Sequence, residues 1–245
     1  DRENEGDLCV IGEYATADAI NFMAKYGRGL ICLALTRVRT EQLGLTMMER
    51  RNESRHETAF TISIEAREGV TTGISAADRS LTIKTAIDPN CGERDITTPG
   101  HIFPLIARDG GTLVRAGHTE AVVDIARACG SDNPSGVICE IMKDDGEMAR
   151  LPDLIGFAKE HDLKIASIAD LIAWRRRNES LVQRTVESAI TTRIGGDWRM
   201  VIYANTVSNI EHIALVKGDI SAGDPFLVGM HALGLMADLL GAVSE

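Results

Sequence analysis

The segment 115–120, Arg-Ala-Gly-His-Thr-Glu, holds several side chains that can bind an anion. A run of apolar residues with the spacing of one helical face follows, at Val122, Ile125, Ala126 and Cys129, and Gly130 is placed to end that helix. The start of a helix attracts anions because its backbone N–H groups and dipole point there. Arg115 can hold a phosphate with two parallel hydrogen bonds, Gly117 lets the backbone approach a ligand, and Thr119 can cap the helix or bind an oxygen. The segment alone is also compatible with a capped helix that carries a surface arginine and histidine.

Four carboxylates lie within the first seven residues, Asp-Arg-Glu-Asn-Glu-Gly-Asp. Clustered oxygen ligands suit Mg²⁺, which typically takes one or two protein carboxylates and keeps waters and substrate oxygens for its other positions. The segment therefore indicates a magnesium site. An isolated acidic run can also be a solvated turn, so both interpretations stay open at this point.

Two further residues could move protons. Glu140 interrupts the apolar segment 137–142, which has the length of a core strand. A carboxylate in a buried strand is costly unless it is paired, bound to a metal or functional, so Glu140 is a candidate catalytic residue. His101 stands at the start of an apolar run, where it could simply be a hydrogen-bonded residue at a sheet edge. Histidine is also the residue type most often used as a general acid or base.

Composition narrows the class of protein. The chain has 245 residues, of which 44% are hydrophobic and 25% charged, an ordinary globular balance. A net charge of −10 argues against non-specific binding of nucleic acid. The five cysteines are scattered and form no CxxC pair, which favours a reducing cytoplasm and gives no case for zinc or disulfides. Neither a signal peptide nor an apolar run of membrane-spanning length is visible, so we expect a soluble cytoplasmic protein with no membrane partner.

The pattern of elements predicts the fold class. Leu30–Leu35 is continuously apolar and indicates a strand buried on both faces. Strands alternate with helices up to about Ser180, which predicts an α/β fold with a mixed β-sheet covered by helices on both faces. Beyond that point three strands are expected to form a meander, at 183–192, 198–204 and 211–216. We therefore predict two domains, residues 1–180 and a small β-rich module at 181–245.

Local signals give further expectations. Helix N-caps are predicted at Thr16, Ser75 and Ser167. Short strands are predicted at 112–114 and 164–167. The segment 36–57 is polar and long, which is typical of an exposed loop, and Arg175–Arg177 is expected to be a solvated helix end.

Five motifs in the chain resemble one family. They are Asp1–Asp7 (DRENEGD), Gly69–Arg79 (GVTTGISAADR), Pro99–Leu105 (PGHIFPL), Arg115–Glu120 (RAGHTE) and Gly136–Ile141 (GVICEI). In this order they resemble 3,4-dihydroxy-2-butanone 4-phosphate synthase of riboflavin biosynthesis, over about Asp1 to Ser180. The chain begins within the first motif, so we expect residues, and one further strand, to be missing before Asp1.

The resemblance implies that D-ribulose 5-phosphate is converted to 3,4-dihydroxy-2-butanone 4-phosphate and formate. It implies that Glu3 and His118 bind Mg²⁺ (or Mn²⁺), with one or two ions in each site and Glu5 a weaker candidate for the second. Glu140 and His101 are then the proton-transfer residues, and Asp7 and Glu140 bind the substrate. The substrate phosphate is expected to bind to residues of the fourth motif and to one arginine of the first motif: Arg115, Ala116, Gly117, His118, Thr119 and Arg2. Glu3 is also expected to contact the substrate.

The resemblance also implies features around this site. Family members form homodimers in which both subunits contribute to each active site. Segment 36–57 becomes a lid that closes over the substrate, although a surface excursion remains an alternative. Cys32 is a weak candidate near the substrate, because a buried thiol is usually an inert core residue.

The C-terminal module resembles a second family in part. Residues 211–219 resemble the opening of GTP cyclohydrolase II, which is often fused behind the synthase. Relatives with that activity bind zinc through three cysteines, whereas the cysteine at position 139 is the last in this sequence, and 228–232 reads Val-Gly-Met-His-Ala. We therefore expect a degenerate structural module without zinc. The alternatives are a regulatory subunit that binds a sugar phosphate without catalysis, and a bifunctional synthase and cyclohydrolase.

Overall fold

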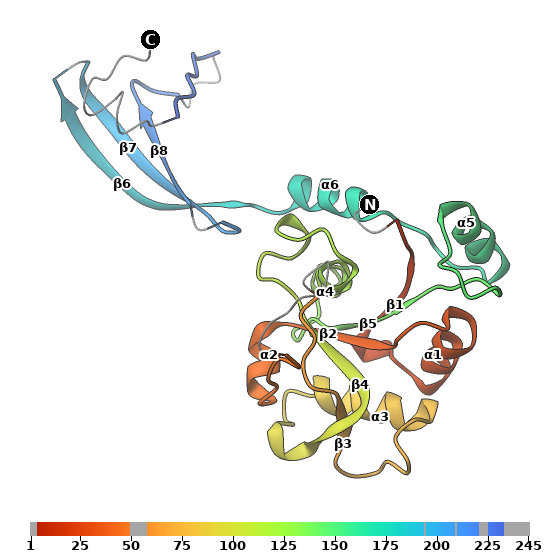
Figure 1. The fold of residues 1–245 in the computed structure, drawn as a ribbon. Helices are drawn as coiled ribbons and strands as arrows, with labels where there is room; N and C mark the ends of the chain where they lie inside the picture. Colours follow the sequence, from red (N-terminus) through yellow and green to blue (C-terminus); the bar gives the residue numbers. More distant parts are fainter. Residues whose placement is uncertain (1–3, 50–57, 194, 209, 221–224, 233–245) are drawn as a thin grey trace. The chain divides into compact units, whose positions relative to one another are not determined.

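The structure is a computed structural model that describes residues 4–49, 58–193, 195–208, 210–220 and 225–232. The chain divides into two compact units, which we describe separately (Figure 1). The larger unit comprises residues 1–181 and 205–209, and the smaller unit holds the other residues from Val182 onward.

The larger unit is built on a five-stranded mixed sheet with the strand order β1-β5-β2-β4-β3 (Figure 1). The strands are β1 (Asp7–Ile11), β2 (Cys32–Leu35), β3 (Ile64–Ala66), β4 (Ile96–Ile106) and β5 (Gly136–Glu140). β2 and β4 run parallel, and the other neighbours run antiparallel. The mixed sheet predicted from the sequence is confirmed.

Helices cover both faces of this sheet. Successive side chains of β2 point to opposite faces, so Leu33 and Leu35 pack in one apolar cluster and Cys32 and Ala34 in another. The first cluster includes residues of α1 (Ala17–Phe22) and α3 (Ala76–Ile87), and the second includes residues of α4 (His118–Ala128). Every residue of β2 is buried, which explains why its sequence is continuously apolar.

The remaining helices of the larger unit lie around this framework. They are α2 (Arg37–Gln42), α5 (Leu151–Glu160), α6 (Ile168–Asn178) and the short turns η1 (Gly12–Tyr14), η2 (Met23–Gly27), η3 (Glu93–Asp95) and η4 (Gly111–Leu113). The three predicted N-caps are confirmed, because the hydroxyls of Thr16, Ser75 and Ser167 each accept a hydrogen bond from the backbone N–H three residues later. Among the residues that the structure describes, no helix has the length and apolar content that a membrane crossing requires.

Three local predictions are corrected. Residues 112–114 are not a strand, because Gly110 and Gly111 take positive φ angles of 85° and 63° and turn the chain into η4. Residues 164–167 form no strand before α6. The segment 36–57 begins with α2, whose buried Arg39 donates to the backbone carbonyls of Ala86, Asp88 and Cys91. Residues 50–57 lie outside the described part, so the lid stays a prediction.

Arg175 on α6 is buried, which corrects its prediction as part of a solvated helix end. Its guanidinium donates to Asp124 Oδ2 on α4 at 2.7 Å, to the Gly110 carbonyl at 2.9 Å and to both carboxylate oxygens of Glu179. Asp124 is itself only 3% exposed and also accepts from the backbone N–H and hydroxyl of Thr112. These contacts attach α6 to the start of η4 and to α4.

The smaller unit contains a three-stranded sheet with the order β6-β7-β8. Its strands are β6 (Val182–Thr192), β7 (Gly196–Asn205) and β8 (Glu211–Val216), so the predicted meander is confirmed.

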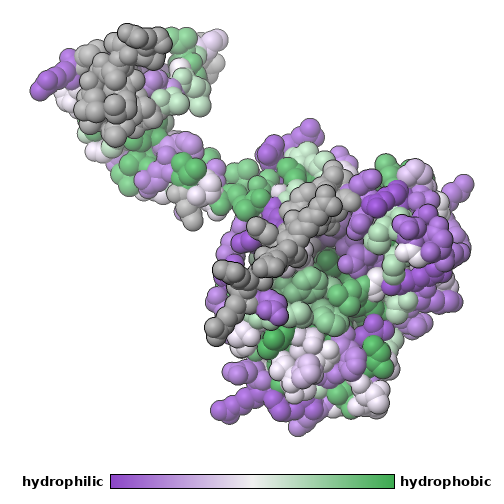
Figure 2. All heavy atoms as spheres, viewed as in Figure 1, coloured by the Kyte–Doolittle hydropathy of each residue, from purple (hydrophilic) through white to green (hydrophobic). Residues whose placement is uncertain are grey.

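In the larger unit, Figure 2 shows apolar side chains gathered near the middle of the face in view, with hydrophilic side chains around them.

Replacing Arg175 by alanine tests the contact between α6 and α4. We expect Arg175→Ala to lower the free energy of unfolding of the larger unit by about 2 kcal/mol, because the buried Asp124 carboxylate loses one of its two guanidinium partners and keeps only Arg127, at 2.9 Å from Oδ1. All helices in the described residues belong to the larger unit, so urea unfolding followed by the helical circular dichroism signal measures it. The matched control is Arg176→Ala, which removes an exposed arginine. Equal stability of the two variants would contradict this account of Arg175.

Candidate active site

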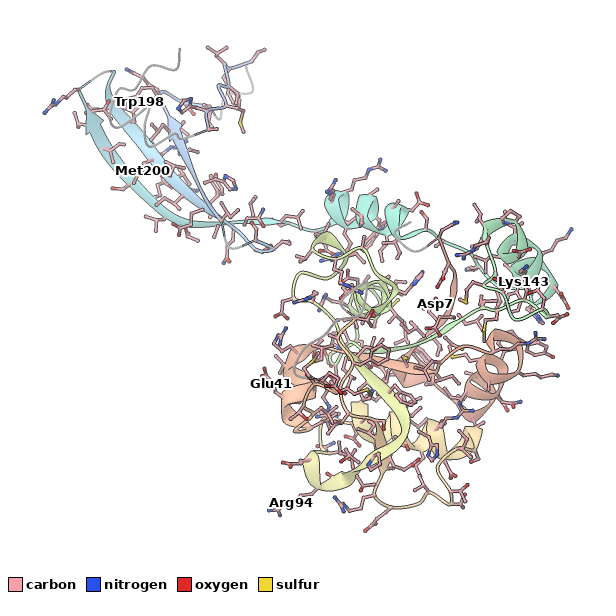
Figure 3. All side chains as sticks on the ribbon, in the orientation of Figure 1. Asp7, Glu41, Arg94, Lys143, Trp198 and Met200 are labelled. Carbon is pink, nitrogen blue, oxygen red and sulfur yellow. The ribbon has the colours of Figure 1, made fainter. Side chains whose placement is uncertain are left out.

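The pairing of β1 with β5 brings two predicted site residues side by side. Asp7 is directly opposite Glu140 in this antiparallel pair, and directly opposed residues place their side chains on the same face. Ile138, two residues before Glu140, packs in the cluster beneath α4, so Asp7 and Glu140 lie on the face that α4 covers. Figure 3 labels Asp7 on β1.

Glu140 is the last residue of β5 and does not interrupt the strand, which corrects the predicted strand 137–142. The carboxylate is therefore at the end of the sheet and is partly exposed. One oxygen, Oε2, accepts a hydrogen bond from the backbone N–H of Leu30 at 2.8 Å. Gly29 permits this approach, because a Cβ atom there would stand 2.6 Å from Glu140 Oε2.

The register of β2 and β4 extends this row of residues to His101. Cys32 pairs with both Ile138 and Phe103, and Glu140 and His101 each lie two residues from those partners, toward the end of the sheet at which β2 begins. Phe103 packs in the cluster on the α4 side, whereas Ile102 packs in the opposite cluster, which places His101 on the same face as Phe103. The structure thus brings Asp7, Glu140 and His101 into one row across the sheet.

His118 reaches this row from the start of α4. It is the first residue of that helix, and its Nδ1 is 3.4 Å from Asp7 Oδ1. The two side chains are 20% and 7% exposed. A histidine that binds a metal typically has a carboxylate behind its other ring nitrogen, so the arrangement at Asp7 fits a metal at His118.

The rest of the predicted metal site is not described. Glu3 and Arg2 lie outside the described residues, and within the described part no group of three His, Cys, Asp or Glu side chains is placed to hold a metal ion. Glu5, the weaker candidate for a second ion, has an oxygen 3.6 Å from Nη1 of Arg150. A magnesium ion does not need three protein ligands, because it usually keeps several waters.

Arg115, predicted to bind phosphate, is held by a buried carboxylate. Its Nη1 is 2.7 Å from Glu120 Oε2, and Glu120 Oε1 accepts from the Arg108 backbone N–H at 2.9 Å. Glu120 is only 1% exposed and the Arg115 side chain 12%. A Cβ atom at Gly117 would lie 2.3 Å from Arg115 Nη1, so a glycine is needed beneath this pair. The guanidinium is therefore fixed in place before any ligand arrives.

The neighbours of Arg115 surround the start of α4. Ala116 is exposed, and Gly117 is the N-cap, so the alternative in which Thr119 caps this helix is wrong. Thr119 is the second helical residue and is buried. The first hydrogen bond of the helix runs from Ala121 N–H to the Gly117 carbonyl, which leaves the earlier N–H groups outside the helical ladder.

Sequence reasoning missed Glu65, which contacts His101. Glu65 Oε2 is 2.8 Å from His101 Nδ1, and the side chains are 12% and 43% exposed. Glu65 stands between Ile64 and Ala66 in β3, all three buried. A carboxylate flanked by apolar residues, the signal present at Glu140, is also present at Glu65 and could have identified it.

Two buried thiols lie close to these residues. Burial raises the pKa of Cys32, and the negative charges of Glu140 and Asp7 raise it further. Burial also raises the pKa of Cys139 to about 12. Both side chains are therefore neutral thiols at physiological pH, which favours the core interpretation of Cys32.

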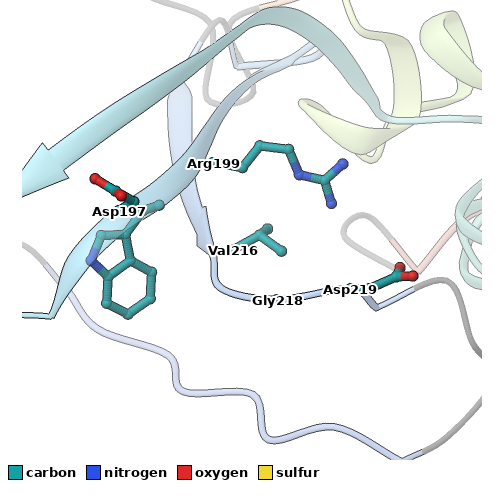
Figure 4. A pocket seen from close by; sticks show the side chains of 6 residues that line it. Asp197, Arg199, Val216, Gly218 and Asp219 are labelled. Carbon is teal, nitrogen blue, oxygen red and sulfur yellow. The ribbon is translucent and has the colours of Figure 1, made fainter.

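The smaller unit has a separate open cavity of about 490 Å³ (Figure 4). It is lined by residues of β7, β8 and the segment after β8: Asp197, Trp198, Arg199, Val216, Gly218 and Asp219. None of these residues was predicted as a site residue.

Comparison with protein families gives two matches. Residues 1–174 match the family described as 3,4-dihydroxy-2-butanone 4-phosphate synthase, and residues 183–245 match GTP cyclohydrolase II. The chain is 51% identical over 240 residues to a 3,4-dihydroxy-2-butanone 4-phosphate synthase of Pseudomonas aeruginosa, covering 98% of this chain and 65% of that protein. It is 51% identical over 241 residues to a riboflavin biosynthesis protein of Bacillus cereus, covering 98% and 60%. The chain thus spans less than two thirds of the length of these relatives.

Solved structures show the same likeness. A two-domain 3,4-dihydroxy-2-butanone 4-phosphate synthase from A. baumannii matches with a TM-score of 0.78 and 47% identity, covering 91% of this chain and 65% of that one. A 3,4-dihydroxy-2-butanone 4-phosphate synthase in complex with two magnesium ions matches with a TM-score of 0.69 and 38% identity, covering 73% and 88%.

The raised thiol pKa values predict a pattern of chemical modification. At about pH 8 the thiolate fraction of Cys139 is on the order of one part in ten thousand, and burial also blocks access. We expect iodoacetamide to modify the exposed Cys129 in the folded protein and to reach Cys32 and Cys139 only after unfolding in urea. Peptide mass spectrometry measures each site. Modification of Cys32 at the rate of Cys129 would show that the sheet near Glu140 is open to solvent.

Proposed function

Because the chain belongs to the 3,4-dihydroxy-2-butanone 4-phosphate synthase family, we propose that it converts D-ribulose 5-phosphate to 3,4-dihydroxy-2-butanone 4-phosphate and formate in riboflavin biosynthesis. The single observation that carries this proposal is the placement of Asp7, Glu140 and His118 together at the end of the sheet beneath α4. The proposal rests on the larger unit alone.

In this proposal the substrate phosphate binds at the start of α4. Arg115, held by Glu120, supplies a fixed positive charge, and the N-terminal N–H groups of the helix add hydrogen-bond donors. Ala116, Gly117 and Thr119 line the approach, and Arg2 is proposed to join them. A phosphate held away from the breaking bonds orients the reacting carbons, because binding energy there is converted into alignment at the reaction centre.

Glu3 and His118 are proposed to hold Mg²⁺ or Mn²⁺, one or two ions in each site. The support in this chain is the Asp7 carboxylate behind Nδ1 of His118, and a family relative has been solved with two magnesium ions. A bound divalent ion polarises adjacent carbonyl and hydroxyl oxygens and stabilises the charge of an enediolate.

Glu140 and His101 are proposed to transfer the protons. Enolisation of the ketose requires a base that removes a proton from a carbon and an acid that returns one to an oxygen. Glu140 is suited to the first role because the hydrogen bond from Leu30 N–H fixes one of its oxygens at the sheet end. His101 can exchange roles between acid and base during the later loss of the C1 hydroxyl and of C4 as formate. Asp7, beside Glu140, is proposed to bind a substrate hydroxyl.

We also propose that the protein is a homodimer whose subunits share their active sites. We expect light scattering after size exclusion to give twice the chain mass of 26.5 kDa, and specific activity to fall on dilution as the dimer dissociates. An active species with the mass of one chain would contradict the proposal.

The reaction itself is tested by measuring formate release from D-ribulose 5-phosphate. We expect formate in the presence of Mg²⁺ and none after removal of divalent ions by EDTA, with recovery when Mg²⁺ or Mn²⁺ is added back. Glu140→Gln is expected to lower the rate at least about 100-fold without unfolding the protein, because the amide cannot accept the proton.

The control is Glu147→Gln, which removes an exposed carboxylate after β5 and is expected to keep the normal rate. Unchanged turnover by Glu140→Gln would remove Glu140 from the proposed role. A folded dimer that binds the substrate without releasing formate would favour a regulatory subunit over an enzyme.

A further inference from the structure

Glu65 and His101 form a pair at the end of the catalytic row. Ile64 on β3 is opposite Ile102 on β4, and the register shifts directly after this pair, so that Glu65 is opposite Thr97 while its side chain reaches His101. Glu65 Oε2 is 2.8 Å from Nδ1 of His101, which is the distance of a good hydrogen bond. The pair therefore extends the row that contains Asp7 and Glu140 to the outermost strand of the sheet.

A tight turn closes over the Glu65 carboxylate. Gly73 has a φ of 87°, and a Cβ atom there would lie 2.1 Å from Glu65 Oε1. Asp78 holds this turn, since its carboxylate accepts from the backbone N–H groups of Thr71 and Gly73 and from the Thr71 hydroxyl. The turn thus covers Oε1 of Glu65 and supplies no hydrogen-bond donor to it.

The hydrogen bonds of Glu65 point to a role at His101. Its Oε1 is buried and has no hydrogen-bond partner among the described residues, whereas Oε2 contacts His101. A buried carboxylate with one unused oxygen is costly, and a hydrophobic residue of similar size would suit an apolar strand better. Stability alone therefore gives a poor reason for a carboxylate at this position.

We propose that Glu65 is a positioning residue for His101. Its carboxylate accepts the Nδ1–H of the neutral imidazole, fixes that tautomer and ring orientation, and leaves Nε2 as the nitrogen that takes or gives a proton. This inference rests on the proposed function, because it assigns Glu65 a part in the proton transfers of His101. Asp78 and Gly73 then serve to keep the carboxylate in place.

The first test measures the His101 tautomer in the wild-type protein and needs no activity. In protein with ¹⁵N-labelled histidine, long-range proton–nitrogen spectra distinguish the two neutral tautomers, and the variant His101→Asn identifies the His101 signals. We expect the Nδ1–H form in the wild type and a shift toward a mixture of tautomers in Glu65→Leu. A wild-type His101 with its proton on Nε2 would overturn the proposal.

The second test separates turnover from substrate binding. Glu65→Gln keeps the size of the side chain and removes its charge, so we expect kcat for formate release to fall at least about tenfold while KM changes by less than about twofold. Glu65→Asp restores a carboxylate and should recover part of kcat. The comparison variant Glu120→Gln alters another buried carboxylate, which holds Arg115, and should mainly raise KM. Glu68→Gln, an exposed neighbour, should match the wild type.

A double variant tests whether Glu65 acts through His101. If it does, adding Glu65→Gln to His101→Asn lowers kcat no further than His101→Asn alone. The proposal would be overturned if the decreases in kcat of the two single variants multiplied in the double variant, or if Glu65→Gln had a normal kcat. Should Glu65→Gln fail to fold, Glu65→Asp and the wild-type tautomer still decide it. If the wild type releases no formate, the proposed reaction fails, whereas the tautomer spectra still report on the Glu65–His101 pair.

Discussion

The candidate site depends on the register between β1 and β5. This pairing sets Asp7 opposite Glu140, and the side chains of a strand alternate between the two faces. A shift of one residue would turn Asp7 toward the face covered by α1 and α3 and bring Leu8 beneath α4. The packing of Leu8 in the apolar cluster on the α1 side opposes that shift, because the shift would replace Leu8 there by a carboxylate and take Asp7 away from His118. Packing of the apolar core thus fixes the register that places Asp7 beside Glu140.

Carboxylates placed behind basic side chains recur throughout the larger unit. Asp7 stands behind His118, Glu120 behind Arg115, and Glu65 behind His101. In each pair the carboxylate is the more buried partner. The carboxylate therefore contacts the basic group on the side that faces the protein interior, and the opposite side of the basic group remains available to a ligand. Such an arrangement orients the basic group before the substrate binds, which lowers the entropic cost of reaching the reactive geometry.

Local sequence signals predicted the local features of this fold. Residues 32–35 of the predicted strand 30–35 form β2, although Leu30 is exposed and lies before the strand. The hydroxyls of Thr16 and Ser75 cap their helices, and the alternating segments after Ser180 became β6, β7 and β8. Glu140 was identified because a carboxylate in an apolar run is unusual. The features that were missed depend on contacts between distant residues, and no local pattern records them. Arg175 resembles the exposed arginines that follow it, and only the fold brings it to Asp124, 51 residues earlier.

The contact between Arg175 and Asp124 also determines where the larger unit ends as a folding unit. The match to the synthase family stops at residue 174, one residue before the guanidinium that neutralises a buried carboxylate. A chain shortened at that point would retain Asp124 on α4 and Thr112 on η4, but the buried carboxylate would lose one of its two guanidinium partners and keep only Arg127. Glu179, which binds the other side of the same guanidinium, belongs to this unit for the same reason. The larger unit therefore extends beyond residue 174, where the match to the synthase family ends.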